Sequence, residues 1–134
     1  MGRSLILETS FLVDYERENN RGVSGPALAF LETHEDDRIY ITFTVAGELA
    51  AGLSLADRAR WQEFVAPFHV LPLNHDVAWE YGRAWRYLQG NGLLIGANDL
   101  WIAAAGVAYR MPVVTRNVGH YGRVPDLEVE PYRS

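Results

Sequence analysis

The chain has 134 residues, 49% of them hydrophobic, and a formal net charge of −5, which together predict one compact globular domain over residues 1–134 and exclude a disordered chain. It contains no Cys, so disulfides and thiolate metal sites are excluded, and a metal could be bound only by carboxylate, His or Asn side chains. All 12 basic residues are Arg, so the sequence has no Lys-rich nucleic-acid surface and would bind phosphate locally, through guanidinium groups.

The apolar pattern alternates between short runs typical of buried strands and the three- and four-residue spacing typical of helices. In chain order, the predicted elements are a strand at residues 4–7, helices at 11–18 and 28–33, a strand at 38–43, helices at 45–53 and 56–64, a strand at 69–73, helices at 77–88 and 100–109, and strands at 113–114 and 127–129. Strands separated by helical segments indicate an α/β protein with a mainly parallel sheet, because parallel neighbours need such connections.

Polar residues and Pro mark where several helices begin. Ser24 and Pro26 predict the N-cap and first turn of the second helix, and Asn74 predicts the N-cap of the long helix that follows it. Asn98 and Asp99 open a helix so rich in Ala and other apolar residues that we expect it to be nearly buried.

No apolar run reaches the roughly 20 residues that a membrane span needs. Residues 1–13 contain a short apolar run, but Glu8 interrupts it and no small-residue cleavage site follows, which argues against a secretory signal. We therefore expect a cytoplasmic protein without a membrane segment.

Four polar residues stand near the predicted carboxyl ends of strands, where open α/β sheets bind their ligands. Glu8 ends the first strand, Glu48 lies in the helix after the second, Asp99 begins the apolar helix, and Asn117 follows the fourth strand. They are far apart in the sequence, so only the fold could bring them together. Oxygen ligands of this kind would suit Mg²⁺ or Mn²⁺.

Four segments resemble the motifs of the PIN-domain family, of the kind found in VapC-type toxins. They are ILETSFLVD at residues 6–14, VAGEL at 45–49, GANDLWIAA at 96–104 and TRNVGHY at 115–121. Their order and spacing agree with the family over nearly the full chain. The resemblance implies a three-layer α/β/α PIN-like fold with a mainly parallel sheet of four to five strands.

The same resemblance implies a metal-dependent endoribonuclease that hydrolyses RNA phosphodiester bonds as the toxin of a type II toxin–antitoxin pair. Glu8, Glu48 and Asp99 would be catalytic and would bind Mg²⁺ or Mn²⁺, with Glu48 as a ligand or as a base that orients water. Carboxylates about 4 Å apart repel by roughly 4 kcal/mol at an effective dielectric near 20, so such a cluster favours a bound cation.

The closing motif supplies the remaining implied site residues. Asn117 would complete the catalytic set, and Thr115 and Arg116 would contact the substrate. The implied partners are an RNA substrate, a second copy of the chain in a homodimer, and a small DNA-binding antitoxin of the VapB type that covers the acidic groove.

Two residues depart from the family pattern. Glu8 stands where the family usually has Asp and is longer by one methylene, roughly 1.5 Å of bond length, and Asn117 is neutral where an acid is common. We expect His120, at another position where Asp is frequent, to be structural or exposed. An alternative therefore stays open: a catalytically weak or inactive PIN-fold protein that acts as a binding or regulatory partner.

Overall fold

A five-stranded sheet in the order β3-β2-β1-β4-β5 forms the centre of the computed structural model, which describes residues 2–133. The strands are β1 (Ser4–Leu7), β2 (Arg38–Thr42), β3 (His69–Leu71), β4 (Val113–Val114) and β5 (Val129–Glu130). Every neighbouring pair is parallel. The expectation of an α/β protein with a mainly parallel sheet is therefore confirmed.

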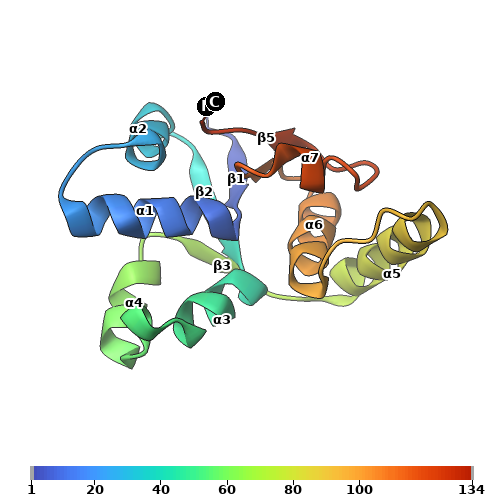
Figure 1. The fold of residues 1–134 in the computed structure, drawn as a ribbon, viewed down its shortest axis with the longest axis horizontal. Coiled ribbons are helices and arrows are strands. Elements are labelled where there is room, and N and C mark those ends of the chain that lie inside the picture. Colours follow the sequence, from blue (N-terminus) through green and yellow to red (C-terminus); the bar gives the residue numbers. More distant parts are fainter. Residues whose placement is uncertain (1, 134) are drawn as a thin grey trace.

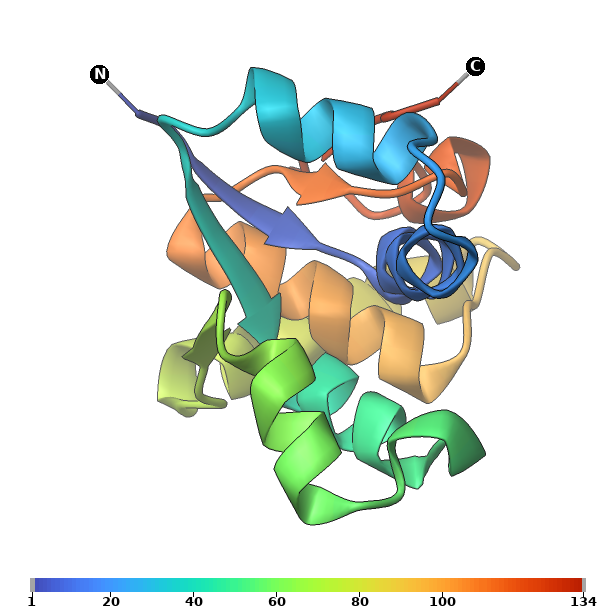
Figure 2. The same ribbon diagram turned by 90° about the vertical axis from the view of Figure 1, so that its left-hand side faces the viewer.

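Helices cover both faces of this sheet. They are α1 (Thr9–Arg21), α2 (Pro26–Thr33), α3 (Phe43–Ala51), α4 (Arg58–Val65), α5 (His75–Gly90), α6 (Ala97–Tyr109) and α7 (Val118–Tyr121), with a short 3-10 helix, η1 (Leu53–Leu55), after α3. α1 and α2 lie on one side of the sheet and α5 and α6 on the other, which gives the expected three layers (Figure 1). In Figure 2, β1, β2 and β4 run side by side in front of α6.

The central strand and α6 form the heart of the core. Leu5, Ile6 and Leu7 of β1 are fully buried because helices cover both faces of a parallel sheet. α6 is nearly buried, as its composition predicted, and packs so closely that a Cβ on Gly106 would lie 2.6 Å from Leu127 Cδ1. No helix within residues 2–133 is both long and apolar enough to cross a bilayer.

The strand order creates a switch point between β1 and β4. From β1 the chain continues to β2 on one side of the sheet, whereas β4 and β5 extend the other side. Neighbouring connections diverge there, which opens a crevice at the carboxyl ends of the strands. Ile6 pairs with Val113, and Leu7 pairs with Val114, so the residues that follow β1 and β4 emerge together.

The predicted N-cap of the second helix is wrong, whereas Pro26 stands in its first turn as expected. Gly25, rather than Ser24, is the N-cap residue of α2, and it makes no side-chain cap. The cap comes from Glu18 at a distance, whose carboxylate accepts hydrogen bonds from the backbone N–H groups of Gly25, Ala27 and Leu28 at 2.9–3.0 Å. A carboxylate from α1 thus binds the free amides that begin α2.

Other predicted boundaries shift by a few residues. The helix expected at 45–53 begins at Phe43, because the Thr42 hydroxyl accepts a hydrogen bond from Val45 N and starts the helix directly after β2. The last strand lies at Val129–Glu130 instead of 127–129, since its register is set by pairing with β4. Neither contact is visible in local apolar spacing.

Candidate active site

Acidic side chains gather near the carboxyl ends of β1, β2 and β4, and we call the cluster of Glu8, Glu48 and Asp99 the acidic pocket. Glu8 is the first residue after β1, and Thr115 is the first after β4. β2 runs directly into α3, which carries Glu48, and Asp99 lies in the first turn of α6. Three acidic side chains from separate parts of the sequence therefore share one region.

Glu8 joins the strand, the helix and the closing loop. It is 3% exposed and is the N-cap of α1, where its Oε1 accepts a hydrogen bond from Ser10 N at 3.1 Å. The hydroxyls of Ser10 and Thr115 donate to the same oxygen, each at 2.5 Å. Three donors thus fix Glu8 Oε1. These three hydrogen bonds do not use the second carboxylate oxygen, Oε2.

Glu48 is half-buried beside the other two acids. Burial raises the pKa of its carboxyl, and the negative charges of Asp99 and Glu8 raise that pKa further, against the hydrogen bond from Thr9. Thr9 Oγ1 donates to Glu48 Oε1 at 3.1 Å. Like charges disfavour ionisation when they lie near one another, so the negative charges of Glu8 and Asp99 act on Glu48 in the same direction as its burial.

Asp99 is oriented by two side chains of α7. Tyr121 donates its hydroxyl hydrogen to Asp99 Oδ1 at 3.2 Å, and His120 Nε2 lies 3.0 Å from Oδ2. Burial raises the pKa of the Tyr121 hydroxyl, as do the charges of Glu8 and Asp99. Tyr121 therefore stays neutral and acts as a donor to the acidic pocket.

The closing loop contributes mainly through its backbone. Thr115 is buried and also accepts a hydrogen bond from Asn117 N at 3.0 Å. Arg116 N donates to Ser10 Oγ at 3.2 Å, while its guanidinium turns to Asp14 at 2.9 Å. Among the six candidate residues, Thr115 contacts Glu8 directly, Asn117 contacts Thr115 through its backbone, and the Arg116 guanidinium lies at Asp14 rather than at the acids.

The carboxylates of Glu8, Glu48 and Asp99 do not form a complete metal-coordination site on their own. Within residues 2–133, no group of three or more His, Asp and Glu side chains is arranged to hold a metal ion as it stands. Instead, Glu8 and Asp99 use oxygens to accept from hydroxyl and imidazole groups. The donor set nevertheless fits Mg²⁺, which keeps several waters and binds proteins through only one or two carboxylates.

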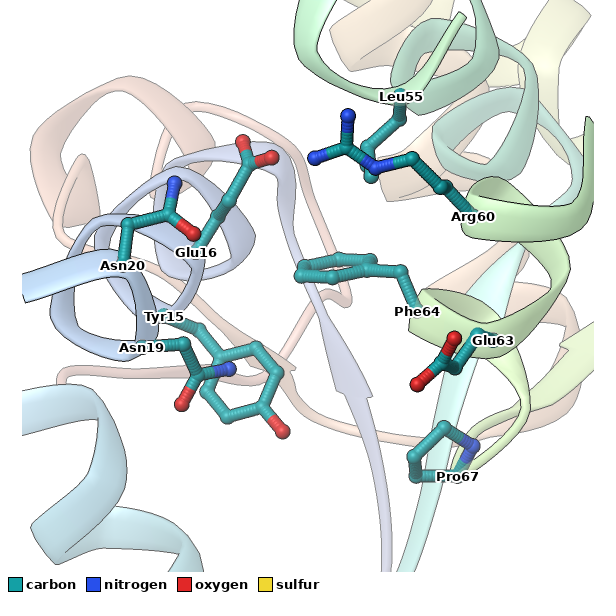
Figure 3. Close-up of a pocket in the computed structure, with 9 residues that line it drawn as sticks. All are labelled: Tyr15, Glu16, Asn19, Asn20, Leu55, Arg60, Glu63, Phe64 and Pro67. Carbon is teal, nitrogen blue, oxygen red and sulfur yellow. The ribbon is translucent and has the colours of Figure 1, made fainter. Parts of the chain in front are cut away.

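A separate hollow of about 310 Å³ lies between α1 and α4 (Figure 3). Tyr15 and Phe64 give it an apolar surface, and the side chains of Arg60 and Glu16 point towards each other beside it. None of the six candidate residues lines this hollow. The candidate site at the strand ends is therefore separate from this hollow.

Local sequence reasoning missed the groups that hold the acids in place. His120, expected to be structural or exposed, lies against Asp99, and Tyr121, which received no role, reaches the same carboxylate. Ser10 and Thr9 orient Glu8 and Glu48. The available signal was that all four belong to the motif segments at residues 6–14 and 115–121.

Comparison with known proteins covers nearly the whole chain. The family model of the PIN domain matches residues 5–125. Ribonuclease VapC of Rickettsia bellii is 31% identical over 133 residues, which covers 93% of each chain. Ribonuclease VapC5 of Mycobacterium tuberculosis is 32% identical over 88 residues, covering 60% of this chain and 65% of that relative.

Solved structures share the fold. VapBC2 from Rickettsia felis, bound to a DNA fragment from its promoter, matches with a TM-score of 0.82 and 25% identity over 97% of this chain and 99% of that chain. DNA-bound VapBC from Salmonella typhimurium gives a TM-score of 0.83 over 99% of this chain and 100% of that chain, at 20% identity. The second likeness is one of fold alone.

Proposed function

Because this chain belongs to the PIN-domain family, we propose that it is a divalent-metal-dependent endoribonuclease and the toxin of a type II toxin–antitoxin pair. The observation that carries the proposal is the meeting of Glu8, Glu48 and Asp99 at the switch point of the sheet, where two of the charges raise the pKa of the third. A relative with 31% identity named Ribonuclease VapC supports the choice of RNA as substrate.

Asp99 and Glu8 would be the metal ligands, with Glu48 as a third ligand or as a base. A bound Mg²⁺ or Mn²⁺ would supply charge that polarises a phosphodiester and lowers the pKa of a bound water. The chain contains no Cys thiolate, and carboxylate oxygen suits these two ions.

The chain's own residues position the groups that react. Glu48, whose pKa is raised by burial, is suited to accept a proton from water, because a general base works best with a pKa near the operating pH. Thr9 orients this carboxylate, and Tyr121 with His120 orients Asp99. Such supporting contacts hold ligands in the required geometry.

The closing loop would hold the RNA next to these acids. Asn117 carries an exposed amide beside the pocket, and Arg116 carries a guanidinium that can bind a phosphate through two hydrogen bonds. Thr115 contributes indirectly, since its hydroxyl fixes Glu8. The neutral Asn117 leaves three carboxylates in the site, which suits a single metal ion.

The proposed partners follow from the structural neighbours. Several are complexes whose names pair a VapC with a VapB, so we propose a small antitoxin of the VapB type for this chain. We also propose that it forms a homodimer and acts in the cytoplasm.

One observation favours a second candidate function, an inactive PIN-fold binding partner. Glu8 Oε1 is already held by Ser10 and Thr115, as expected of a structural cap. In this alternative the Glu8 side chain acts as the N-cap of α1 instead of as a metal ligand, and the acidic pocket binds metal weakly.

A ribonuclease assay separates the two candidates. Cleavage of RNA should require Mg²⁺ or Mn²⁺, stop with chelator, and fall at least 100-fold in Asp99→Ala, because even the loss of a supporting contact to a ligand typically costs 10–100-fold. As a control, Asp36→Ala removes an exposed acid that is not one of the candidate residues, and this variant should cleave RNA as the wild type does. Titration calorimetry with Mn²⁺ should show binding to the wild type and to Asp36→Ala, and its loss in Asp99→Ala.

The variant Glu8→Asp tests the alternative directly. A wild type that neither cleaves RNA nor binds Mn²⁺, but gains both abilities in Glu8→Asp, would establish the inactive partner instead. If Asp99→Ala cleaves as well as the wild type, the acidic pocket is not the active site.

A further inference from the structure

A second charged region lies along α1, beyond its first turn at Glu8. Asp14 is almost buried, and three guanidinium groups surround its carboxylate. Arg116 lies 2.9 Å from it, Arg133 3.2 Å and Arg17 3.5 Å. Tyr132 also donates its hydroxyl hydrogen to Asp14 Oδ2.

One carboxylate cannot neutralise this cluster. Burial alone would raise the pKa of Asp14, but the hydrogen bond from Tyr132 and the charges of Arg116 and Arg133 outweigh it, so that pKa is lowered. Asp14 is therefore ionised and contributes one negative charge against three positive ones. The side chains of the three Arg residues remain 38–51% exposed, so their outer N–H groups face solvent.

The neighbouring acid on α1 offers no further compensation. Glu18 is buried, and its two oxygens accept from the backbone amides that begin α2. Arg21 is exposed one turn beyond Arg17, and no carboxylate lies within 4 Å of it in the part of the chain that the structure describes. Arg17, Arg21 and Arg133 line one hollow of about 240 Å³ together with Asp14 and Glu18, whose carboxylates are taken up by the contacts described above.

We call Arg17, Arg21, Arg116 and Arg133 the arginine face. We propose that the arginine face binds backbone phosphates of the RNA strand whose scissile phosphate lies at Glu8 and Asp99. The inference rests on the proposed function, which it extends by assigning the path of the strand outside the acidic pocket.

The geometry connects the face to the pocket. Arg116 N donates to Ser10 Oγ, which in turn donates to Glu8, so the face begins next to the acids. At a helical rise of about 1.5 Å per residue, Arg17 and Arg21 stand roughly 13 and 19 Å along α1 from Glu8. With stacked nucleotides about 3.4 Å apart, this corresponds to roughly four to six nucleotides from the cleaved bond.

Charge explains why such a face is needed. The whole chain carries −5 and the pocket itself is acidic, so RNA is repelled except where guanidinium groups gather. The face holds four of the 12 basic residues. Guanidinium groups match phosphate through paired hydrogen bonds, and two of the four, Arg17 and Arg21, follow one another at one-turn spacing along α1, as the phosphates of one strand do along its backbone.

The test compares two double variants with the same change of charge. Arg17→Gln/Arg21→Gln removes half of the arginine face and spares the contacts of Arg116 and Arg133 to Asp14. The control, Arg58→Gln/Arg86→Gln, removes exposed charges from α4 and α5. The probe is a fluorescein-labelled single-stranded RNA of 12 nucleotides, measured by anisotropy with EDTA at 0.05–0.3 M salt.

We expect the first variant to bind the RNA about 25-fold more weakly at 0.1 M salt and its salt slope to fall by about 1.4, because each phosphate contact to a single strand contributes about 0.7 to that slope. The control should lose less than three-fold. With Mn²⁺, the first variant should cleave with a raised KM and an unchanged kcat.

Three results would overturn the inference. The first is an equal loss of RNA affinity in the two double variants. The second is a wild type that cleaves RNA but does not bind the labelled RNA in EDTA. The third is an Arg17→Gln/Arg21→Gln variant that keeps its RNA affinity but loses affinity for the antitoxin, which would assign the face to an acidic protein segment. A wild type that neither binds nor cleaves RNA would overturn the proposed function as well, so the two failures are distinguishable.

Discussion

Replacing Glu18 by Ala should destabilise the protein without altering the candidate active site. The carboxylate is 9% exposed and accepts three backbone hydrogen bonds at 2.9–3.0 Å from Gly25, Ala27 and Leu28. A hydrogen bond to a charged group contributes about 1.5–3 kcal/mol, and an unpaired buried donor costs about 1–3 kcal/mol. Because the amides lie at a helix start that water can partly reach, we expect a loss of about 3 kcal/mol.

The measurement is urea unfolding at pH 7, with thermal unfolding alongside. A loss of 3 kcal/mol corresponds to a fall in Tm of about 10 °C for a chain of this size. Glu18→Gln keeps one acceptor oxygen and should lose roughly half as much. Glu32→Ala, an exposed acid on α2, is the matched control and should stay within about 0.5 kcal/mol of the wild type.

The structural role of Glu18 also predicts what does not change. Since Glu18 lies outside the acidic pocket, folded Glu18→Ala should cleave RNA at 20 °C as the wild type does. A free energy of unfolding within about 0.5 kcal/mol of the wild type would refute the remote cap. It would mean that another group or solvent satisfies the three amides equally well.

Three further predictions concern the pocket and the core. In EDTA at pH 7, Glu48→Gln should unfold at a higher temperature than the wild type. The pKa of Glu48 is raised above 4.5 in the folded protein, so its protonated carboxyl adds stability below pH 4.5, and this stability is lost as the pH rises through the raised pKa. The difference in melting temperature should vanish below pH 4.5, and equal melting temperatures at pH 7 would contradict the prediction. Thr115→Val should lower stability by about 1–2 kcal/mol in urea unfolding and reduce cleavage, since a buried hydroxyl no longer donates to Glu8. Gly106→Ala should cost about 1–3 kcal/mol by the same assay, because the new Cβ meets Leu127 and Val113; unchanged stability would mean that α6 can move away from β4.

Local sequence patterns predicted the helices and strands but not the contacts that set their boundaries. The buried strands and the apolar helix at 100–109 were found because burial leaves a periodic trace in the sequence. The cap of α2 was assigned to the wrong residue because the capping carboxylate, Glu18, lies in the preceding helix. The last strand was misplaced because pairing with β4 sets its register.

The candidate acids illustrate the same division. Glu8, Glu48 and Asp99 could be chosen from sequence because each follows a predicted strand or opens a helix at the edge where parallel sheets bind ligands. Their roles as metal ligands stay a prediction. The groups that hold them, above all His120 and Tyr121, lie in the motif segment at residues 115–121, but their contacts to Asp99 could not be predicted, because they depend on how α7 packs against α6.

By itself, the sequence determined a parallel α/β domain without thiol ligands and the strand ends where a site could form, because apolar periodicity and residue chemistry are local properties. Only the tertiary structure showed that Asp14 and Glu18 serve the fold, whereas Glu8, Glu48 and Asp99 remain the candidate site. Asp14 and Glu18 have the same charge as the candidate ligands, yet one binds Arg116, 102 residues away, and the other caps α2. Such a choice depends on which donors folding brings to each carboxylate, and no local pattern records it.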